Sequence, residues 1–423
     1  MGITLTALLA LALMSCQRDS AGAPDASACG TFNSCAQTTA AAVTRLSRLA
    51  TTPGLEWSRE VGEPGRGSPG APILLEANHK LAASVSSSEL WLLDTADGAG
   101  TPIFRVGLHN SVGNAAADAE ENLYAATSSM VIALTPQGQT RWALRVPTFE
   151  PNVGPPPAFA VSPGGVFVAS PDGNLYKLDR SDGQVLWRAA LGLSSYDSLA
   201  GSLDTIYVGT ERGVLAVDAS TGALRWRPLV CRGLGVNMLT RNHALVSSYL
   251  DGITVGSGLD ACGQHSFELP AWHSRILELS DGSTALMVGA PVGARDHIDH
   301  LAPDGSVLER IELGLAALRG NDLYAIGSDD TAYVLECYRD AAQQVRARML
   351  GLHLDTVPAT TELVAELGEQ CATYPAGGVI GQDGVLYFAL GGSIIALQTW
   401  SQGPAVGSWS VPGGDNRNSH WHP

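Results

Sequence analysis

A tryptophan that recurs after a fixed pattern of short apolar runs and turns constrains this chain more than any other feature of its sequence. In three successive segments, two short runs of β-branched and aromatic residues are separated by a glycine-containing turn, and a second turn leads to the tryptophan. These tryptophans are Trp142, Trp187 and Trp226, which stand 45 and 39 residues apart. Each segment therefore predicts a β-hairpin followed by a third strand.

Weaker copies of the same unit extend the repeat in both directions. Upstream, residues 90–94 and the Asp97-Gly98 turn lead to Phe104, which takes the place of the tryptophan. Downstream, four further copies cover residues 244–267, 285–311, 323–349 and 385–409. The repeat thus fills eight units of about 43 residues, or seven if one weak unit is spurious, and this period is typical of β-propeller blades.

A closed ring is the arrangement that such units favour. Each unit is too small to bury both faces of its own sheet, and an open stack would leave aggregation-prone edges. A ring packs every sheet between two neighbours. We therefore expect an all-β chain with a single β-propeller of about eight four-stranded blades over residues 57–423, in which Trp57 adds a strand that helps to close the ring.

Two units contain a longer motif that resembles the tryptophan-docking repeat of quinoprotein-like (PQQ-like) β-propellers. Residues 216–226 match that repeat in full, and residues 179–187 match it with Asp182 in place of threonine. The segment 409–419 is similar to a Trp–Gly-Asp–Asn segment common at the ends of such propellers. The resemblance implies a structural role in docking neighbouring blades for Asp179, Gly183, Trp187, Ala216, Asp218, Thr221, Gly222, Trp226, Trp142 and Trp409.

The amino terminus has the features of an export signal. The apolar run 3–14 is shorter than the ~20 residues that a transmembrane helix needs, but it has the length of a signal-peptide core. It ends in Leu13-Met14-Ser15-Cys16, which resembles a bacterial lipobox, although no Lys or Arg precedes the run. We expect a lipoprotein signal peptide over residues 1–15, lipidation of Cys16 and a flexible tether over residues 16–56; an ordinary secretory signal is the alternative.

These features predict a protein of the cell envelope that is attached to a membrane through a lipid anchor. Gln17, rather than Asp, follows the cysteine, which by the common rule for bacterial lipoproteins favours the outer membrane. The body of the protein would then lie in the periplasm or at the cell surface. A formal net charge of −16 argues against nucleic-acid binding, because clustered Lys and Arg supply the affinity for phosphates.

Six cysteines remain besides Cys16, and an even number in an exported chain favours disulfides over free thiols. The sequence leaves their connectivity open. Pairing between sequence neighbours gives Cys29–Cys35, Cys231–Cys262 and Cys337–Cys371. No paired C-x-x-C knuckles occur, so a zinc site is not expected.

The sequence offers little catalytic or metal-binding chemistry. The PQQ-dependent alcohol dehydrogenases that the repeat resembles carry adjacent cysteines over the quinone, and this chain has no Cys-Cys pair. Asp296, Asp329 and Asp330 are candidate calcium ligands, for which a solvated loop is the better interpretation. We expect neither catalytic residues nor a bound metal.

Two histidine-containing segments have metal-ligand residue types. On a strand, His297 and Asp299 would share one face while His300 pointed to the other, which disfavours a shared metal. The terminal segment His420-Trp421-His422 is expected to be a frayed end.

Binding remains as the expected activity, and departures from the repeat should mark the surface that performs it. Residues 147–157 form a polyproline-like loop between the second and third units, and residues 350–375 lengthen the seventh unit, where a Cys337–Cys371 bridge would hold them. The alternative is that both are passive surface loops.

We therefore expect a membrane-tethered, non-enzymatic propeller that binds a protein or an extracellular ligand through its loop face, without a cofactor. A PQQ- or calcium-dependent periplasmic oxidoreductase is the alternative. The resemblance also implies a narrower variant of the first function, an accessory lipoprotein of outer-membrane barrel assembly.

Overall fold

The computed structural model describes residues 54–61, 71–85, 89–106, 112–127, 130–145, 157–170, 172–192, 195–202, 204–210, 213–226, 235–239, 244–249, 252–257, 267–269, 272–289, 295–315, 321–368, 371, 377–405 and 421–422. They all belong to the second of two compact units, Val43–Pro423; the first is Met1–Ala42. Several predicted residues lie outside the described ones, namely Cys16, Cys29, Cys35, Cys231, Cys262 and Trp409.

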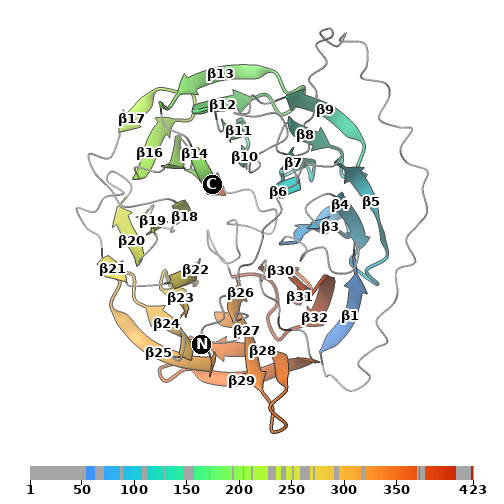
Figure 1. The fold of residues 1–423 in the computed structure, drawn as a ribbon, viewed down its shortest axis with the longest axis vertical. Helices are drawn as coiled ribbons and strands as arrows, with labels where there is room; N and C mark the ends of the chain where they lie inside the picture. Colours follow the sequence, from blue (N-terminus) through green and yellow to red (C-terminus); the bar gives the residue numbers. More distant parts are fainter. Residues whose placement is uncertain are drawn as a thin grey trace, which may run out of the picture. The chain divides into compact units, whose positions relative to one another are not determined.

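The described residues of the second unit form eight β-sheets arranged around a ring, and no α-helix occurs among them (Figure 1). Seven sheets have four strands and one has five. The only helical turn in this part of the chain is the short 3-10 element η2 (Glu76–Asn78). The prediction of an all-β propeller is thus confirmed, with eight blades rather than seven.

The strands of the first four sheets follow in chain order from the inside of the ring outward. The first sheet contains β2 (Ile73–Leu75), β3 (Lys80–Val85), β4 (Glu89–Asp94) and β5 (Gly100–Arg105). The second contains β6 (Val112–Ala117), β7 (Leu123–Thr127), β8 (Met130–Leu134) and β9 (Thr140–Arg145). The third contains β10 (Ala158–Ser162), β11 (Gly165–Ser170), β12 (Asn174–Leu178) and β13 (Val185–Ala190). The fourth contains β14 (Ser195–Ser202), β15 (Thr205–Thr210), β16 (Gly213–Asp218) and β17 (Leu224–Trp226).

The remaining four sheets continue in the same order. The fifth contains β18 (Gly235–Leu239), β19 (Ala244–Tyr249), β20 (Gly252–Ser257) and β21 (Phe267–Leu269). The sixth contains β22 (Trp272–Glu278), β23 (Thr284–Gly289), β24 (Arg295–Leu301) and β25 (Val307–Leu315). The seventh contains β26 (Asp322–Ile326), β27 (Thr331–Arg339), β28 (Val345–His353) and β29 (Thr360–Gly368). The eighth contains β30 (Gly378–Ile380), β31 (Val385–Leu390), β32 (Ser393–Gln398) and β1.

The first strand of the chain closes the ring. β1 (Leu55–Glu60) pairs antiparallel with β32, with Trp57 opposite Ala396, and becomes the outermost strand of the eighth sheet. A buried cluster between the first and eighth sheets, which includes Trp91 and Tyr387, completes the circle. The strand expected around Trp57 is therefore present, and it begins two residues before the expected boundary.

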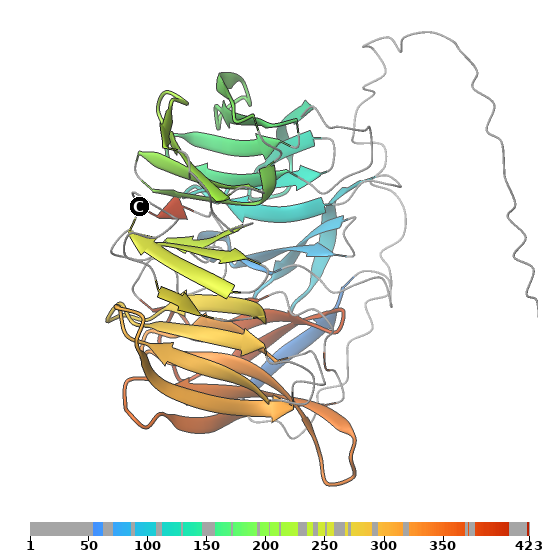
Figure 2. The ribbon, with the colours of Figure 1, turned by 60° about the vertical axis from the view of Figure 1, so that its left-hand side comes forward.

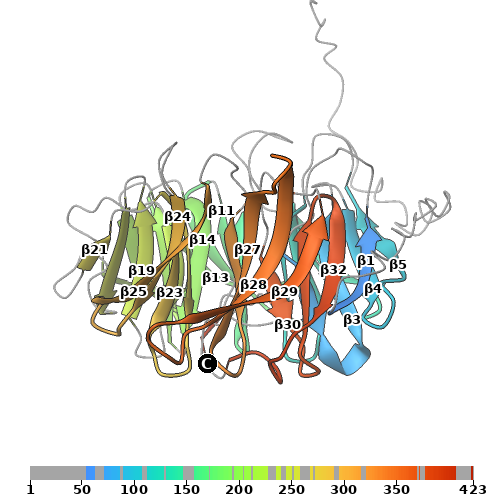
Figure 3. The same cartoon turned by 90° about the horizontal axis from the view of Figure 1, so that it is seen from below.

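Burial falls from the inside of the ring to its outer edge. β31 is buried at all six positions, because it packs between two neighbouring sheets as well as between two strands. β13, at the outer edge of the third sheet, has only exposed and half-buried positions. An outer edge also tolerates Pro102 in β5, since that strand needs no further ladder hydrogen bond there. Figures 2 and 3 show the strands running between the two faces of the ring.

The structure corrects the expectation for residues 350–375. Residues 350–353 complete β28 and residues 360–368 form β29, so half of this segment is sheet rather than an added surface loop. β28 is paired along its length with β27 on one side and with β29 on the other. The extra residues thus lengthen the third strand, whose backbone groups form hydrogen bonds with the strands on both sides.

The expectation of a frayed carboxy terminus was also wrong. Trp421–His422 form β33, which pairs in parallel with β14, with Trp421 opposite Gly201. Figure 1 shows the carboxy terminus beside β14 on the inner side of the ring. The inner edge of β14 presents unpaired backbone groups, and an extended segment can satisfy them.

Candidate binding surface

The ring has two faces with different connections. Because the strands within a sheet alternate in direction, turns between second and third strands lie at one end of the ring, together with the connections between sheets. We call this end the connection face; residues 340–344 are an example. Turns between first and second strands, and between third and fourth strands, lie at the other end, the turn face, of which residues 327–330 and 179–184 are examples.

The predicted tryptophans join neighbouring sheets. Trp142 of β9 lies against Gly183 of the third sheet, where an added Cβ would come within 2.7 Å of the indole. The indole Nε1 donates a hydrogen bond of 2.9 Å to the carbonyl of Arg180. Trp187 lies in the same way against Gly222 of the fourth sheet. Both glycines have a φ of 75°, a backbone conformation that other residues rarely adopt.

Carboxylates organise the turns that receive these indoles. Asp218 Oδ1 accepts hydrogen bonds from the backbone N–H and the hydroxyl of Thr221, both at 2.9 Å. Hydrogen bonds from the hydroxyl of Ser220 and from Arg225 hold the pKa of Asp218 well below its usual range. Asp179 Oδ1 likewise accepts from the backbone N–H and the hydroxyl of Ser181 in its own turn. Ala216 is fully buried opposite Trp226 in the same sheet. These contacts hold each turn together at the place where it meets an indole.

One docking position differs from the expectation. Ile103, rather than Phe104, lies against the glycine of the second sheet, Gly138, where an added Cβ would come within 2.6 Å of its side chain. Ile103 lies in a β-bulge, between two residues that pair with β4. A bulge shifts by one position which side chain points toward the neighbouring sheet. Trp57 fills the equivalent place on the first sheet and donates from Nε1 to the carbonyl of Thr95 at 2.7 Å.

The seventh sheet departs most from the repeat. Its strands β27, β28 and β29 have nine residues each, whereas β31 and β32 of the next sheet have six. Three further residues extend a strand by about 10 Å. Figure 3 shows the hairpin of β27 and β28 rising beyond its neighbours. By strand order, its turn at residues 340–344 belongs to the connection face.

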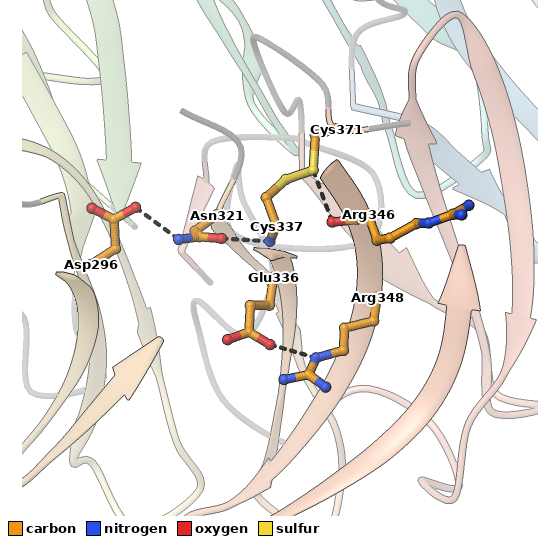
Figure 4. The surroundings of a disulfide bond; sticks show 7 residues. All are labelled: Asp296, Asn321, Glu336, Cys337, Arg346, Arg348 and Cys371. Atoms are coloured by element: carbon orange, nitrogen blue, oxygen red, sulfur yellow. Dashed lines mark hydrogen bonds and ion pairs between the residues drawn. A yellow bond between two sulfur atoms is a disulfide. The ribbon is translucent and has the colours of Figure 1, made fainter. Parts of the chain in front are cut away.

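A disulfide fastens the next connection to this hairpin (Figure 4). Cys337 of β27 is bonded to Cys371, with their Cα atoms 5.9 Å apart, which is the sequence-neighbour pairing. The Cys337 N–H donates to Asn321 Oδ1 at 2.6 Å, and Asn321 Nδ2 donates to Asp296 Oδ2 at 2.8 Å. Cys371 Sγ lies 3.2 Å from the carbonyl oxygen of Arg346; a disulfide sulfur has no proton, so this is a packing contact. The base of the hairpin is thus fixed on two sides.

A group of aromatic and charged side chains lies on the other face of the hairpin. The guanidinium of Arg348 stacks 4.5 Å from the ring centre of Tyr338, and its Nε donates to Glu336 Oε2 at 2.5 Å. The Tyr338 hydroxyl donates to Glu366 Oε2 at 2.8 Å. Burial, and then this hydrogen bond to Glu366, raise the pKa of Tyr338. Tyrosine and arginine held in fixed positions are typical of the centres of protein interfaces.

The tip of the hairpin is ordered by its own hydrogen bonds. Asp340 Oδ2 accepts from Arg346 Nε at 3.1 Å, and Arg339 Nη1 donates to the carbonyl of Gln343 at 2.8 Å. The residues of the turn are exposed except Asp340, which is half-buried. Sequence reasoning missed this group, because its members come from three strands and share no local motif.

The histidine segment of the sixth sheet is a strand, as its alternation indicated. In β24, His297 Nε2 lies 3.6 Å from Asp299 Oδ2 on one face, and Asp299 also accepts two hydrogen bonds from Arg310. On the other face, His300 Nε2 lies 3.0 Å from the hydroxyl of Ser283, and burial lowers the pKa of His300. Within the part of the chain that the structure describes, no three or more His, Cys, Asp or Glu are grouped to hold a metal ion.

The three candidate calcium ligands do not converge. Asp296 lies near the connection face beside Asn321, whereas Asp329 and Asp330 belong to a turn at the opposite face. Asp330 Oδ1 accepts from the backbone N–H of Ser280 in the sixth sheet at 2.7 Å. Asp329 accepts from the hydroxyl of Ser401, beyond the eighth sheet. This turn therefore ties three sheets together, although Asp329 in it is exposed, and these carboxylates do not fit one calcium ion.

The inner strands of the sixth and seventh sheets are joined by an ion pair whose carboxylate is buried. Arg275 Nη2 of β22 lies 3.0 Å from Asp322 Oδ2 of β26. Burial raises the pKa of Asp322 to about 6, and the charge of Arg275 opposes that change. This pair is absent from the predicted site residues because the two positions belong to different sheets and share no sequence motif.

Comparisons with known proteins agree with the propeller fold. Residues 127–256 match the family model described as outer membrane protein assembly factor BamB. The matched segment is less than half of the chain and runs from the second sheet into the fifth. It includes both docking motifs, residues 179–187 and 216–226, so the predicted resemblance to PQQ-like propeller repeats is confirmed there. No curated protein sequence matches the chain.

Solved propellers are similar to most of the chain at low sequence identity. BamB from Moraxella catarrhalis aligns with a TM-score of 0.52 and 15% identity, covering 84% of this chain and 100% of that chain. The computationally designed Ika8 protein aligns with a TM-score of 0.58 and 13% identity, covering 80% and 98%. The C-terminal WD40 domain of Sif2 aligns with a TM-score of 0.56 and 12% identity, covering 82% and 99%. These likenesses establish the fold.

Among the described residues, no helix has the length and apolar character needed to cross a membrane. The polyproline-like loop, residues 147–157, lies outside the described residues except for Pro157.

Proposed function

We propose that this protein is a non-enzymatic propeller of the cell envelope that binds another protein through its connection face. The match of residues 127–256 to the outer membrane assembly factor family carries the proposal, since that family is named for assembly rather than for catalysis. We further propose that lipidated Cys16 attaches the ring to the outer membrane through the tether, with the ring in the periplasm or at the cell surface.

The β27–β28 hairpin is the recognition element in this proposal. It is longer than its neighbours, it carries Tyr338 and Arg348 in fixed positions, and the Cys337–Cys371 bond holds its base. A rigid element loses little conformational freedom on binding, so more of the contact energy contributes to affinity. The narrower form of the proposal is an accessory role in the assembly of outer-membrane β-barrels.

Recovery of a partner from membranes tests the proposal. The full lipidated chain is purified in a mild detergent, and we expect an envelope protein of the barrel-assembly machinery to be retained with it. Arg348→Ala removes the stacked guanidinium and should weaken retention by about tenfold or more, as expected for the loss of an interface arginine.

Arg188→Ala is the matched control. Arg188 stacks 5.6 Å from the ring centre of Tyr176 in the third sheet, and Tyr176 donates to Asp172 much as Tyr338 donates to Glu366. Because Arg348→Ala leaves the buried Glu336 without its partner, Arg339→Glu at the tip is a second variant that keeps the Glu336 pair intact.

Two results would contradict the proposal. One is a failure of the predicted retention: either no partner is retained, or the hairpin variants retain it as well as Arg188→Ala does. The other is oxidation of an alcohol with a dye as acceptor after addition of PQQ and calcium, which would support the oxidoreductase alternative.

A further inference from the structure

Large exposed apolar side chains gather on the turn face at the outer edge of the sixth to eighth sheets. They are between 45% and 64% exposed. Val307 and Leu308 begin β25, Val357 lies in the turn between β28 and β29, Leu363 lies on β29, and Trp400 follows β32. We call these five residues the apolar arc.

Hydrogen bonds and ring packing hold the arc together across the three sheets. The backbone N–H of Ala359, two residues after Val357, donates to Glu309 Oε2 of β25 at 2.7 Å. On the other side, Trp400 packs over Gly351 of β28, and its ring centre lies 6.0 Å from that of His353. His353 Nδ1 in turn lies 3.0 Å from the hydroxyl of Thr331. The arc is therefore a fixed surface built from neighbouring sheets.

The surroundings of the arc are acidic. The turns of the sixth to eighth sheets on this face, at residues 279–283, 302–306, 327–330, 354–359 and 381–384, contain Asp281, Asp304, Asp329, Asp330, Asp355 and Asp383. No Lys, Arg or His occurs in these described turns, and five of the six carboxylates belong to exposed residues. A hydrogen bond from the hydroxyl of Ser306 keeps the pKa of Asp304 below its usual range, so this carboxylate is ionised at neutral pH. The one guanidinium on β25, Arg310, is paired with Asp299.

We propose that the apolar arc binds a polypeptide segment that carries both apolar and basic side chains. The apolar side chains of the segment would cover the arc, and its Lys or Arg side chains would pair with the surrounding aspartates. Removal of exposed apolar area from water provides the affinity, and opposite charge selects the partner.

Two other occupants fit these charges less well. An anionic lipid surface attracts Lys and Arg, and the carboxylates of these turns would be repelled by it. A second copy of this chain has the same net charge of −16, which opposes self-association. The arc lies on the face opposite to the tip of the β27–β28 hairpin, so this inference goes beyond the proposed function, and either one can fail without the other.

Binding of designed peptides to the full chain tests the inference. The lipidated protein is held in nanodiscs of zwitterionic lipid, and a labelled peptide of alternating leucine and lysine is titrated by fluorescence anisotropy. We expect saturable binding that weakens as ionic strength rises. A leucine–glutamate peptide and a serine–lysine peptide should each bind about tenfold more weakly or worse, because each lacks one of the two required interactions.

Substitutions on the surface locate the site. Leu308→Ser together with Val357→Ser should weaken binding of the leucine–lysine peptide by about tenfold. Leu186→Ser is the matched control, because Leu186 is the third residue after the turn glycine of the third sheet, as Leu308 is in the sixth, and it is also exposed. Asp304→Asn together with Asp355→Asn should reduce the salt dependence while leaving the fold intact, since asparagine at 304 can still accept the hydrogen bonds of Ser306 and Asp355 is exposed.

The inference would be overturned by equal losses in the arc and control variants, or by equal binding of the acidic peptide. Self-association of the protein, or binding to anionic vesicles, that disappears with the arc substitutions would also overturn it, because the occupant would then be a second copy or a lipid surface.

Discussion

At the scale of single residues, the contact between an indole and a glycine decides how neighbouring sheets dock. Gly183 and Gly192 both have a left-handed backbone, with φ of 75° and 70°. An added Cβ on Gly183 would lie 2.7 Å from Trp142, whereas nothing lies within 4 Å of one on Gly192. The two positions therefore separate the cost of the backbone conformation from the cost of the clash.

We expect Gly192→Ala to lower the free energy of unfolding by about 1 kcal/mol, because it adds only the strain of a left-handed alanine. Gly183→Ala should lower it by about 2 to 4 kcal/mol, since the indole must also move. Urea unfolding of both variants measures the difference. Equal losses would contradict the docking role of Trp142.

The indole nitrogens provide a second comparison. Trp142 Nε1 donates to the carbonyl of Arg180, whereas Trp187 Nε1 is buried and has no hydrogen-bond partner among the described residues. The carbonyl of Ala219, which occupies the equivalent place, accepts from Lys177 Nζ at 3.1 Å instead. Trp142→Phe should therefore cost about 1 kcal/mol more in unfolding free energy than Trp187→Phe. A smaller loss for Trp142→Phe in thermal or urea unfolding would be inconsistent with these contacts.

Asp322 predicts a pH dependence of stability. Burial raises its pKa to about 6, above the unfolded value of 3.8, so the folded state binds more protons between these values. This carboxyl therefore makes the protein less stable as pH rises from about 4 to about 6, and its effect is constant above that range. The unfolding free energy of the unsubstituted protein, minus that of Asp322→Asn, should fall by on the order of 2 kcal/mol from pH 4 to pH 7. The titration of His300 contributes equally to both proteins and cancels in this difference. An equal pH dependence of the two unfolding free energies would contradict the raised pKa of Asp322.

Single residues also show where sequence reasoning stopped. The docking tryptophans were predictable because each follows its own turn glycine at a fixed distance. Ile103 was not, since a bulge in the pairing of β4 and β5 decides which side chain meets Gly138. The partners of Asp329 and Asp330 were not predictable either, because Ser401 and Ser280 belong to other sheets.

At the scale of elements, the seventh sheet is where the repeat and the structure differ most. The extra residues of this unit predicted an inserted loop. In the structure they lengthen the strands β28 and β29 instead. Alternation within residues 345–353 is consistent with a strand, but only pairing with two neighbours shows that it continues to His353. The parallel pairing of β33 depends on the edge of β14, a strand that lies far away in the sequence. No local pattern in the sequence predicts this pairing.

The disulfide should stabilise this element. Cys337 and Cys371 are 34 residues apart, and closing a loop of that length in the unfolded chain corresponds to about 4 kcal/mol in the chain-entropy model. We expect Cys371→Ala to lower the unfolding free energy by roughly that amount and to speed amide hydrogen exchange in β27 and β28. Exchange in the third sheet is the internal control. Unchanged protection of the hairpin would show that its order does not depend on the bond.

At the scale of the whole molecule, the repeat and its period were enough to predict a ring. Eight sheets account for all of the repeat units, and β1 closes the circle with the last of them. The difference between the two faces could not be predicted from composition, because it follows from the alternation of strand direction. That alternation places the extended hairpin tip on one face and the acidic turns on the other.

In the proposed function, a partner protein binds at the hairpin of the seventh sheet. A photo-cross-linking amino acid at position 342, in the exposed tip of the β27–β28 hairpin, tests this most directly in cells that express the full chain. The same amino acid at position 185, on the outer edge of the third sheet, is the reference. We predict a discrete adduct with an envelope protein from position 342 and none from position 185. Absence of an adduct from position 342, or the same adducts from both positions, would contradict the account.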